Sequence, residues 1–206
     1  MNTRTTLRLS AVIASVLFTI GYCVVLFVPG TGDNNKEKNF TDFYDSDGKM
    51  LVAFLMGIAL VAGALALVWF FNEVKSRITD DALSRVGYTA AVIGASAAAI
   101  GGAILLAPIG VQQNSDSAFV GVAVAHTLDQ AGLGVMLLVG MTALALATAL
   151  FSLGAKRAGL LASWAGWAGV GVAVVMLGSY IWLPGLLFPV WVLAVGLLLR
   201  TEPPAA

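Results

Sequence analysis

Residues 50–71, MLVAFLMGIALVAGALALVWFF, form one long stretch without a single charged side chain. The hydrocarbon core of a bilayer is about 30 Å thick, and a helix needs about 20 apolar residues to cross it. These residues are apolar on every side, whereas the strands of a membrane barrel alternate polar and apolar side chains. The stretch therefore predicts a transmembrane α-helix.

Further uncharged runs along the chain predict five more spans. The first of the six is as long as a full span and lacks a cleavage site of small residues, so we expect it to be retained as a helix. The fourth is expected to begin early, near Ser117, as an extended helix that projects or tilts on the outer side. The last is short and must thin the bilayer or let Arg200 snorkel. The predicted spans are 10–29, 50–71, 86–109, 119–153, 159–182 and 186–199, followed by a disordered tail at 201–206.

The composition excludes several classes of protein. Hydrophobic residues make up 59% of the chain and charged residues 11%, less than half of the roughly 25% charged residues typical of soluble domains. Eleven Lys and Arg balance eleven Asp and Glu, so no basic field is available for nucleic acid. One cysteine, Cys23, and one histidine, His126, exclude an internal disulfide, a cysteine metal cluster and a bis-histidine haem. We expect an all-α integral membrane protein with no cofactor and no metal.

The positive charges indicate an orientation. Eight Lys and Arg fall before the first span, after the second, after the fourth and after the sixth, whereas the other connections hold three. Positive residues collect on the cytoplasmic side of bacterial membrane proteins. The bias predicts a six-helix bundle with both termini in the cytoplasm.

Small residues suggest how the spans pack. Helices in lipid associate by close backbone approach, which small side chains permit. The third span carries Gly94, Ala98 and Gly102, and the fifth carries Ala165 and Gly169. We expect the second, third and fifth spans to form the tight centre, although the abundance of glycine, 23 residues, explains the same pattern without any special packing.

A polar group at the outer mouth of the fourth span is the strongest candidate site. His126, Asp129 and Gln130 follow one another at spacings that place them on one helical face. Ionisable groups near membrane depth are costly and often functional, and such a pair could relay protons, bind a cation or hold a ligand headgroup. The alternative is that these residues lie at the solvent-exposed end of a long helix, where water can hydrogen-bond the histidine.

A second candidate is the acidic cluster in the outer loop between the first two spans, formed by Asp42, Tyr44, Asp45 and Asp47. Clustered carboxylates can bind calcium. A helix–loop–helix calcium site aligned on Gly48 would place Phe43 and Phe54 at its first and last ligand positions, so that pattern fails. Turn and cap chemistry explains the residues better, and Ser46 or Asp47 is expected to cap the second span. Residues 33–38 of this loop are expected to be solvated, and the inner loop 72–85 is expected to hold a short surface helix.

Three runs give the chain its character: DFYDSDGK at 42–49, LLASWAGWAG at 160–169 and LFPVWVL at 187–193. Together with spans rich in Ala, Gly and Val, they resemble bacterial six-helix integral membrane proteins of unknown function. The resemblance is one of layout and covers nearly the whole chain. It implies six spans and a location in the bacterial cytoplasmic membrane, and it carries over no catalytic residue.

Two functions are compatible with these patterns. The first is a non-enzymatic protein that acts by binding, as an accessory or scaffold subunit of a membrane complex, because the span cores carry no charge and the sequence offers no nucleophile–base pair. The alternative is a small-solute or lipid-binding transport component with its mouth on the outer face. The expected surroundings are the lipid bilayer, with a protein partner in the membrane or a small apolar ligand.

Overall fold

The computed structural model describes residues 3–28, 37–78, 81–114, 121–179 and 183–200, and all regular structure within them is helical. Four helices are long and apolar enough to cross a membrane: Arg4–Phe27, Asp47–Lys75, Ala82–Val111 and Val122–Arg157. Two shorter apolar helices follow, Ser163–Met176 and Leu183–Leu198. The prediction of an all-α protein is confirmed, and the apolar helices are those of a multi-pass, membrane-embedded chain.

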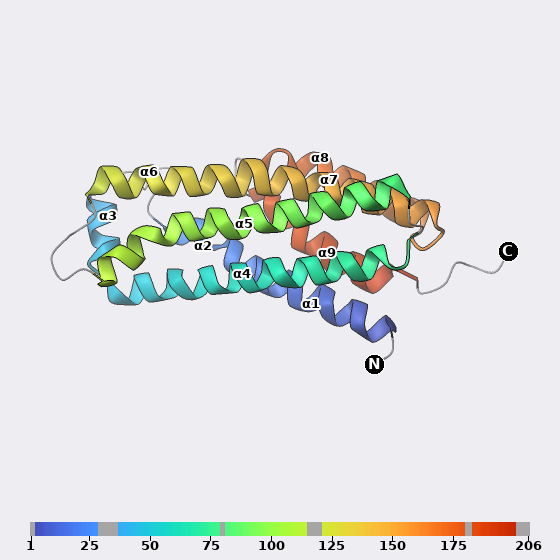
Figure 1. Ribbon diagram of the computed structural model, residues 1–206, viewed down its shortest axis with the longest axis horizontal. Coiled ribbons are helices and arrows are strands. Elements are labelled where there is room, and N and C mark those ends of the chain that lie inside the picture. Colours follow the sequence, from blue (N-terminus) through green and yellow to red (C-terminus); the bar gives the residue numbers. More distant parts are fainter. Residues whose placement is uncertain (1–2, 29–36, 79–80, 115–120, 180–182, 201–206) are drawn as a thin grey trace.

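The long helices lie along the longest dimension of the molecule (Figure 1). The first and last helices, α1 and α9, are confined to one end, where α1 begins and α9 ends; we call it the terminal end. The short helix α3 lies at the other, the α3 end. The elements in chain order are α1 (Thr3–Tyr22), α2 (Val24–Phe27), α3 (Glu37–Tyr44), α4 (Asp47–Lys75), α5 (Ala82–Asn114), α6 (Val122–Leu133), η2 (Gly134–Gly140), α7 (Met141–Arg157), α8 (Ser163–Met176), η4 (Leu183–Leu186) and α9 (Leu187–Leu198).

The fourth helix is about as long as its expected span, 119–153, whereas the fifth is much shorter. The continuous helix α6–η2–α7 has 36 residues, or about 54 Å at 1.5 Å per residue, which exceeds a bilayer core of about 30 Å. Helix α8 has 14 residues, or about 21 Å, and is much shorter than the expected span 159–182. The early start of the fourth helix near Ser117 falls outside the described residues.

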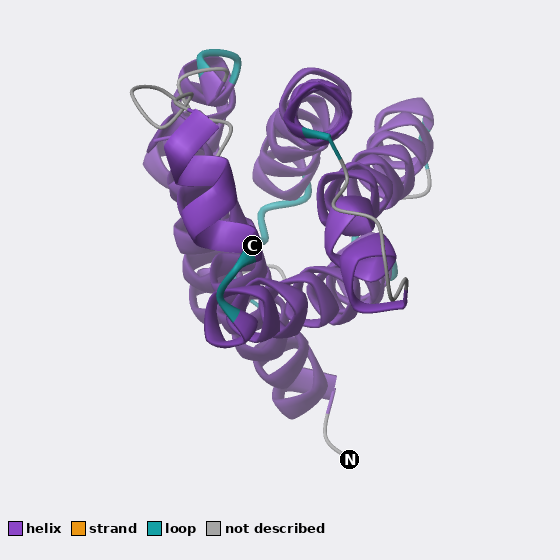
Figure 2. Ribbon diagram, turned by 90° about the vertical axis from the view of Figure 1, so that its left-hand side faces the viewer, coloured by secondary structure: helices purple, strands orange, loops and turns teal. Residues whose placement is uncertain are grey.

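The helices pair differently from the expected arrangement. The most extensive contacts join α1 to α4 and α5 to α7, whereas α8 packs mainly on α7 and α9. The expected contact between the second and third spans is present, because α4 packs on α5, but the fifth span does not join them, so the predicted tight centre is wrong for α8. Seen from the α3 end, the helices surround no single central helix (Figure 2).

Glycines form the closest contacts between helices. A Cβ added to Gly63 on α4 would lie 2.6 Å from the backbone nitrogen of Phe18 on α1. A Cβ added to Gly132 on α6 would lie 2.6 Å from the carbonyl oxygen of Gly101 on α5. Both distances are far below ordinary contact, so only glycine allows these backbones to approach so closely.

The predicted packing residues lie in three different interfaces. Gly94 and Ala98 of α5 face Gly140, where α6–η2–α7 passes, whereas Gly102 faces Leu60 of α4. On α8, Gly169 lies against Ser152 of α7 and Trp191 of α9, and Ala165 is half-buried in a groove between α8 and α9.

Large rings fill the core at the terminal end. Phe71 of α4 stacks on Phe151 of α7 with ring centroids 5.0 Å apart, and it also stacks on Phe188 and Trp191 of α9. The Trp191 indole nitrogen donates a hydrogen bond of 3.1 Å to the hydroxyl of Ser152. A buried indole needs such a partner, so this contact fixes α9 against α7.

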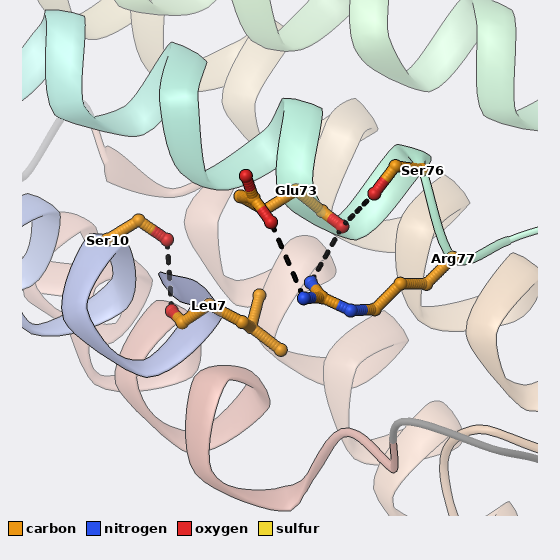
Figure 3. Close-up of polar contacts among 5 residues, drawn as sticks. All are labelled: Leu7, Ser10, Glu73, Ser76 and Arg77. Atoms are coloured by element: carbon orange, nitrogen blue, oxygen red, sulfur yellow. Dashed lines mark hydrogen bonds and ion pairs between the residues drawn. The ribbon is translucent and has the colours of Figure 1, made fainter. Parts of the chain in front are cut away.

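Local hydrogen bonds define the ends of α4. Ser46 is the N-cap, and its hydroxyl accepts a 3.5 Å hydrogen bond from the backbone nitrogen of Lys49, which confirms the predicted cap. At the other end, the Arg77 guanidinium donates to the Glu73 carbonyl at 2.8 Å and pairs with the Glu73 carboxylate at 3.4 Å (Figure 3). No separate surface helix forms among the described residues of 72–85, because α4 continues to Lys75 and α5 begins at Ala82.

We predict that Gly132→Ala lowers the free energy of unfolding in detergent by about 1–3 kcal/mol, because the added methyl group overpacks the contact with α5. Thermal unfolding followed by tryptophan fluorescence measures the effect. The matched control is Gly171→Ala on α8, where a Cβ meets open space and alanine favours the helix. Equal stability of the two variants would contradict the close packing.

Candidate functional site

Helix α3 covers one end of the bundle. It lies against α4 and α6 at the end opposite the start of α1 (Figure 1). Phe40, Phe43 and Tyr44 are its buried residues, and their spacing of three and four places them on one helical face. Residues 37–44 of the expected outer loop thus form a helix whose aromatic face packs onto the bundle. The signal was present in the sequence as this aromatic spacing within a polar segment.

Asp129 lies beneath this cover. Its side chain on α6 is completely buried, and neither carboxylate oxygen has a hydrogen-bond partner among the described residues. Transferring a charged group into a low-dielectric interior without a partner costs several kcal/mol or more. A buried carboxylate without a hydrogen-bond partner requires an explanation, because the great majority of buried polar atoms in proteins are hydrogen-bonded.

His126 lies one turn before Asp129 on α6. Its ring makes an edge contact with the ring of Phe40 on α3, with centroids 5.8 Å apart and planes at 83°. The side chain is half-buried, and its Nδ1 atom is buried without a hydrogen-bond partner among the residues that the structure describes. The histidine therefore keeps an unused ring nitrogen at the contact between α6 and α3.

Tyr44 joins the two predicted clusters. Burial raises the pKa of its phenol well above the usual range, and the negative charge of Asp129 raises it further. The phenol therefore stays neutral at physiological pH and keeps its proton for donation. We call Phe40, Tyr44, His126 and Asp129 the α3 cluster. It combines one aromatic face, one phenol, one imidazole and one carboxylate.

The other predicted site residues lie apart from this cluster. Gln130 is exposed on α6, and Asp42, Asp45 and Asp47 are exposed around the turn between α3 and α4. The Asp42 carbonyl accepts a 3.1 Å hydrogen bond from the Lys49 ammonium, and Asp47 lies in the first turn of α4. No group of three or more metal-ligating side chains occurs among the described residues. The acidic cluster thus contributes only Tyr44 to the buried cluster.

A π-helical segment, η2, begins at Gly134 and was not predicted from the sequence. Gly132, Met136, Gly140 and Leu144 are buried and spaced four residues apart, and all of them lie against α5. In an α-helix this spacing would turn the side chains progressively away from α5, because a turn takes 3.6 residues. The wider π turn keeps the four residues on one line. Such segments are frequent at functional sites.

The arrangement suits the binding of a positive charge or a hydrogen-bond donor. The Asp129 oxygens can accept, the His126 nitrogen can accept or donate, and the Tyr44 hydroxyl can donate. The Phe40 ring offers a face on which cations bind favourably. One carboxylate with one imidazole is too small a set for a transition-metal site with three or more protein ligands.

We predict that Asp129→Asn raises the free energy of unfolding by at least about 1 kcal/mol, because the amide keeps the shape of the side chain and folding no longer has to desolvate or neutralise a carboxylate. Thermal unfolding in detergent at neutral pH measures the effect. Asp45→Asn is the matched control, since Asp45 is exposed and its substitution should change little. A loss of stability in Asp129→Asn would show instead that the carboxylate serves the fold.

Comparison with known proteins finds no relative of this chain: no family model, no curated protein and no solved structure matches it.

Proposed function

We propose that the protein acts by binding a small solute within the membrane, as a transport component whose ligand site is the α3 cluster. The observation that carries this proposal is the completely buried Asp129, with two carboxylate oxygens unpartnered among the described residues. A side chain that destabilises the fold in this way is usually retained where it serves a function. Ionisable side chains at membrane depth are functional candidates for the same reason.

The chemistry of the cluster selects the class of ligand. A carboxylate beneath aromatic rings favours a cationic or proton-donating group, such as an organic ammonium, over an anion. His126 and Tyr44 add one nitrogen and one hydroxyl group that could orient the ligand. Helix α3 covers the site and is held largely by three aromatic side chains, so its displacement would be the simplest route of entry.

We further propose a topology of six crossings with both termini in the cytoplasm of a bacterial cell. The positive-charge bias supports this orientation. Helices α8 and α9 form a hairpin that returns the chain to the terminal end (Figure 1). Because a hairpin returns to its starting side, the beginning of α1 and the end of α9 share a compartment whether the hairpin crosses fully or partly.

An accessory role within a larger complex is a second candidate. A groove of about 490 Å³ lies between α4 and α5, lined entirely by apolar residues. Four of them are Gly57, Ala62, Ala103 and Gly110, small side chains of the kind that lets a partner transmembrane helix approach closely. Co-purification with lipid alone, at native expression, would count against this candidate.

The binding proposal predicts that cations stabilise the wild-type protein but not Asp129→Asn. Thermal unfolding in detergent is measured with tetramethylammonium or ethylammonium, with sodium acetate as an anion control and Asp45→Asn as the control variant. At a concentration about 100-fold above the dissociation constant, a ligand stabilises by about 2.7 kcal/mol. If the cations affect wild type and Asp129→Asn equally, the α3 cluster is not their site.

The topology predicts where single cysteines react. In a Cys23→Ser background, Asp45→Cys should react with a membrane-impermeant maleimide in intact cells, whereas Arg85→Cys should react only after lysis. Both positions are exposed in the structure, so access to the reagent depends on the compartment alone. The reverse pattern would overturn the orientation.

A further inference from the structure

A second site lies at the opposite end of the molecule, between α8 and α9. The two helices enclose an apolar groove of about 160 Å³. Its walls include Trp164 and Leu198, whose side chains are exposed, and Trp191, which forms the floor as part of the aromatic core. In a bilayer this groove opens toward the lipid chains, which makes it a site for a hydrocarbon chain.

The groove ends in positive charge. After α7 the chain turns at Gly159, whose φ of 71° is left-handed and favours glycine. The backbone nitrogen of Arg200 then donates a 3.0 Å hydrogen bond to the carbonyl oxygen of Leu160. This bond holds the end of α9 beside the turn that follows Arg157. Both arginines are exposed, so two positively charged side chains leave the backbone near this end of the groove.

The surrounding sequence leaves this charge largely unopposed. Between residue 130 and the end of the chain the sequence holds a single acid, Glu202, against Lys156, Arg157 and Arg200. Lys156 is already engaged: its stem lies against Gly166, and its ammonium lies 4.5 Å from the ring centroid of Trp167. The two arginines therefore remain as the groups that can approach a ligand.

The length of the groove matches one leaflet of a membrane. Its lining on α9 runs from Leu187 to Leu198, which is about 16 Å at 1.5 Å per residue. Half of a hydrocarbon core of about 30 Å is about 15 Å. Trp164 and Trp167, 68% and 57% exposed, lie near the basic end, where tryptophans mark the interface between hydrocarbon and headgroups.

We propose that this groove binds one anionic phospholipid, with an acyl chain between α8 and α9 and the phosphate held by Arg157 and Arg200. Guanidinium groups bind phosphate oxygens through paired hydrogen bonds, and basic pockets between transmembrane helices select acidic headgroups. The lipid fills the groove between two apolar helices that are shorter than the four long ones. The inference is independent of the α3 cluster and its ligand.

The test compares phosphatidylglycerol with phosphatidylcholine on the purified full-length protein in a neutral detergent. Native mass spectrometry counts bound lipid, and thermal unfolding measures stabilisation. The wild type should retain phosphatidylglycerol in preference to phosphatidylcholine. The double variant R157Q/R200Q should bind phosphatidylglycerol about 10- to 30-fold more weakly, at about 1 kcal/mol for each lost charge. The variant K75Q/R85Q, which also lacks two positive charges, should bind it as the wild type does.

A third variant distinguishes binding of the lipid in the groove from non-specific attraction by charge. Ala168→Leu leaves every charge in place but inserts a larger side chain into the groove, where Ala168 is exposed. It should lose phosphatidylglycerol while remaining as stable as the lipid-free wild type. Equal losses in R157Q/R200Q and K75Q/R85Q, or undiminished binding in Ala168→Leu, would overturn the proposal in favour of non-specific attraction.

Discussion

The close contact between Gly101 of α5 and Gly132 of α6 supports much of this structure. Inside lipid, burying apolar side chains against one another gains little, so helices are held by close backbone packing. A methyl group at either glycine would lie 2.6 Å from the other's carbonyl oxygen. Gly132 lies one turn beyond Asp129, so the contact that joins the helices also sets the position of the buried carboxylate.

The same constraint explains the π-helical segment. After Gly132 the helix must keep Met136, Gly140 and Leu144 against α5, and a regular α-helix would turn them away. Widening the turns preserves the packing. The distorted segment begins five residues after Asp129, whose carboxylate has no hydrogen-bond partner in the part of the chain that the structure describes. This is consistent with a site at which function opposes stability.

The sequence predicted where the helices lie better than it predicted which helices pack against one another. The apolar runs, the Ser46 cap and the candidate face of His126 and Asp129 could all be recognised from spacing and composition. Helix α3 was not predicted, because polar residues such as Glu37 and Lys38 are typical of a solvated loop, although the aromatic spacing indicates a helix. The pairing of α1 with α4 was missed because Ala and Gly occur on nearly every span and therefore do not identify a partner.

The amino-acid sequence was enough to predict a helical chain that is apolar enough for a membrane, because charge is excluded from runs as long as a bilayer is thick. The packing of the helices was needed to show that Tyr44 lies near Asp129 and that Arg200 lies beside the turn after Arg157. The physical reason is that hydropathy acts along one helix, whereas these neighbours come from helices far apart in the chain. Their meeting depends on which backbones approach most closely, and periodicity within one helix does not contain that information.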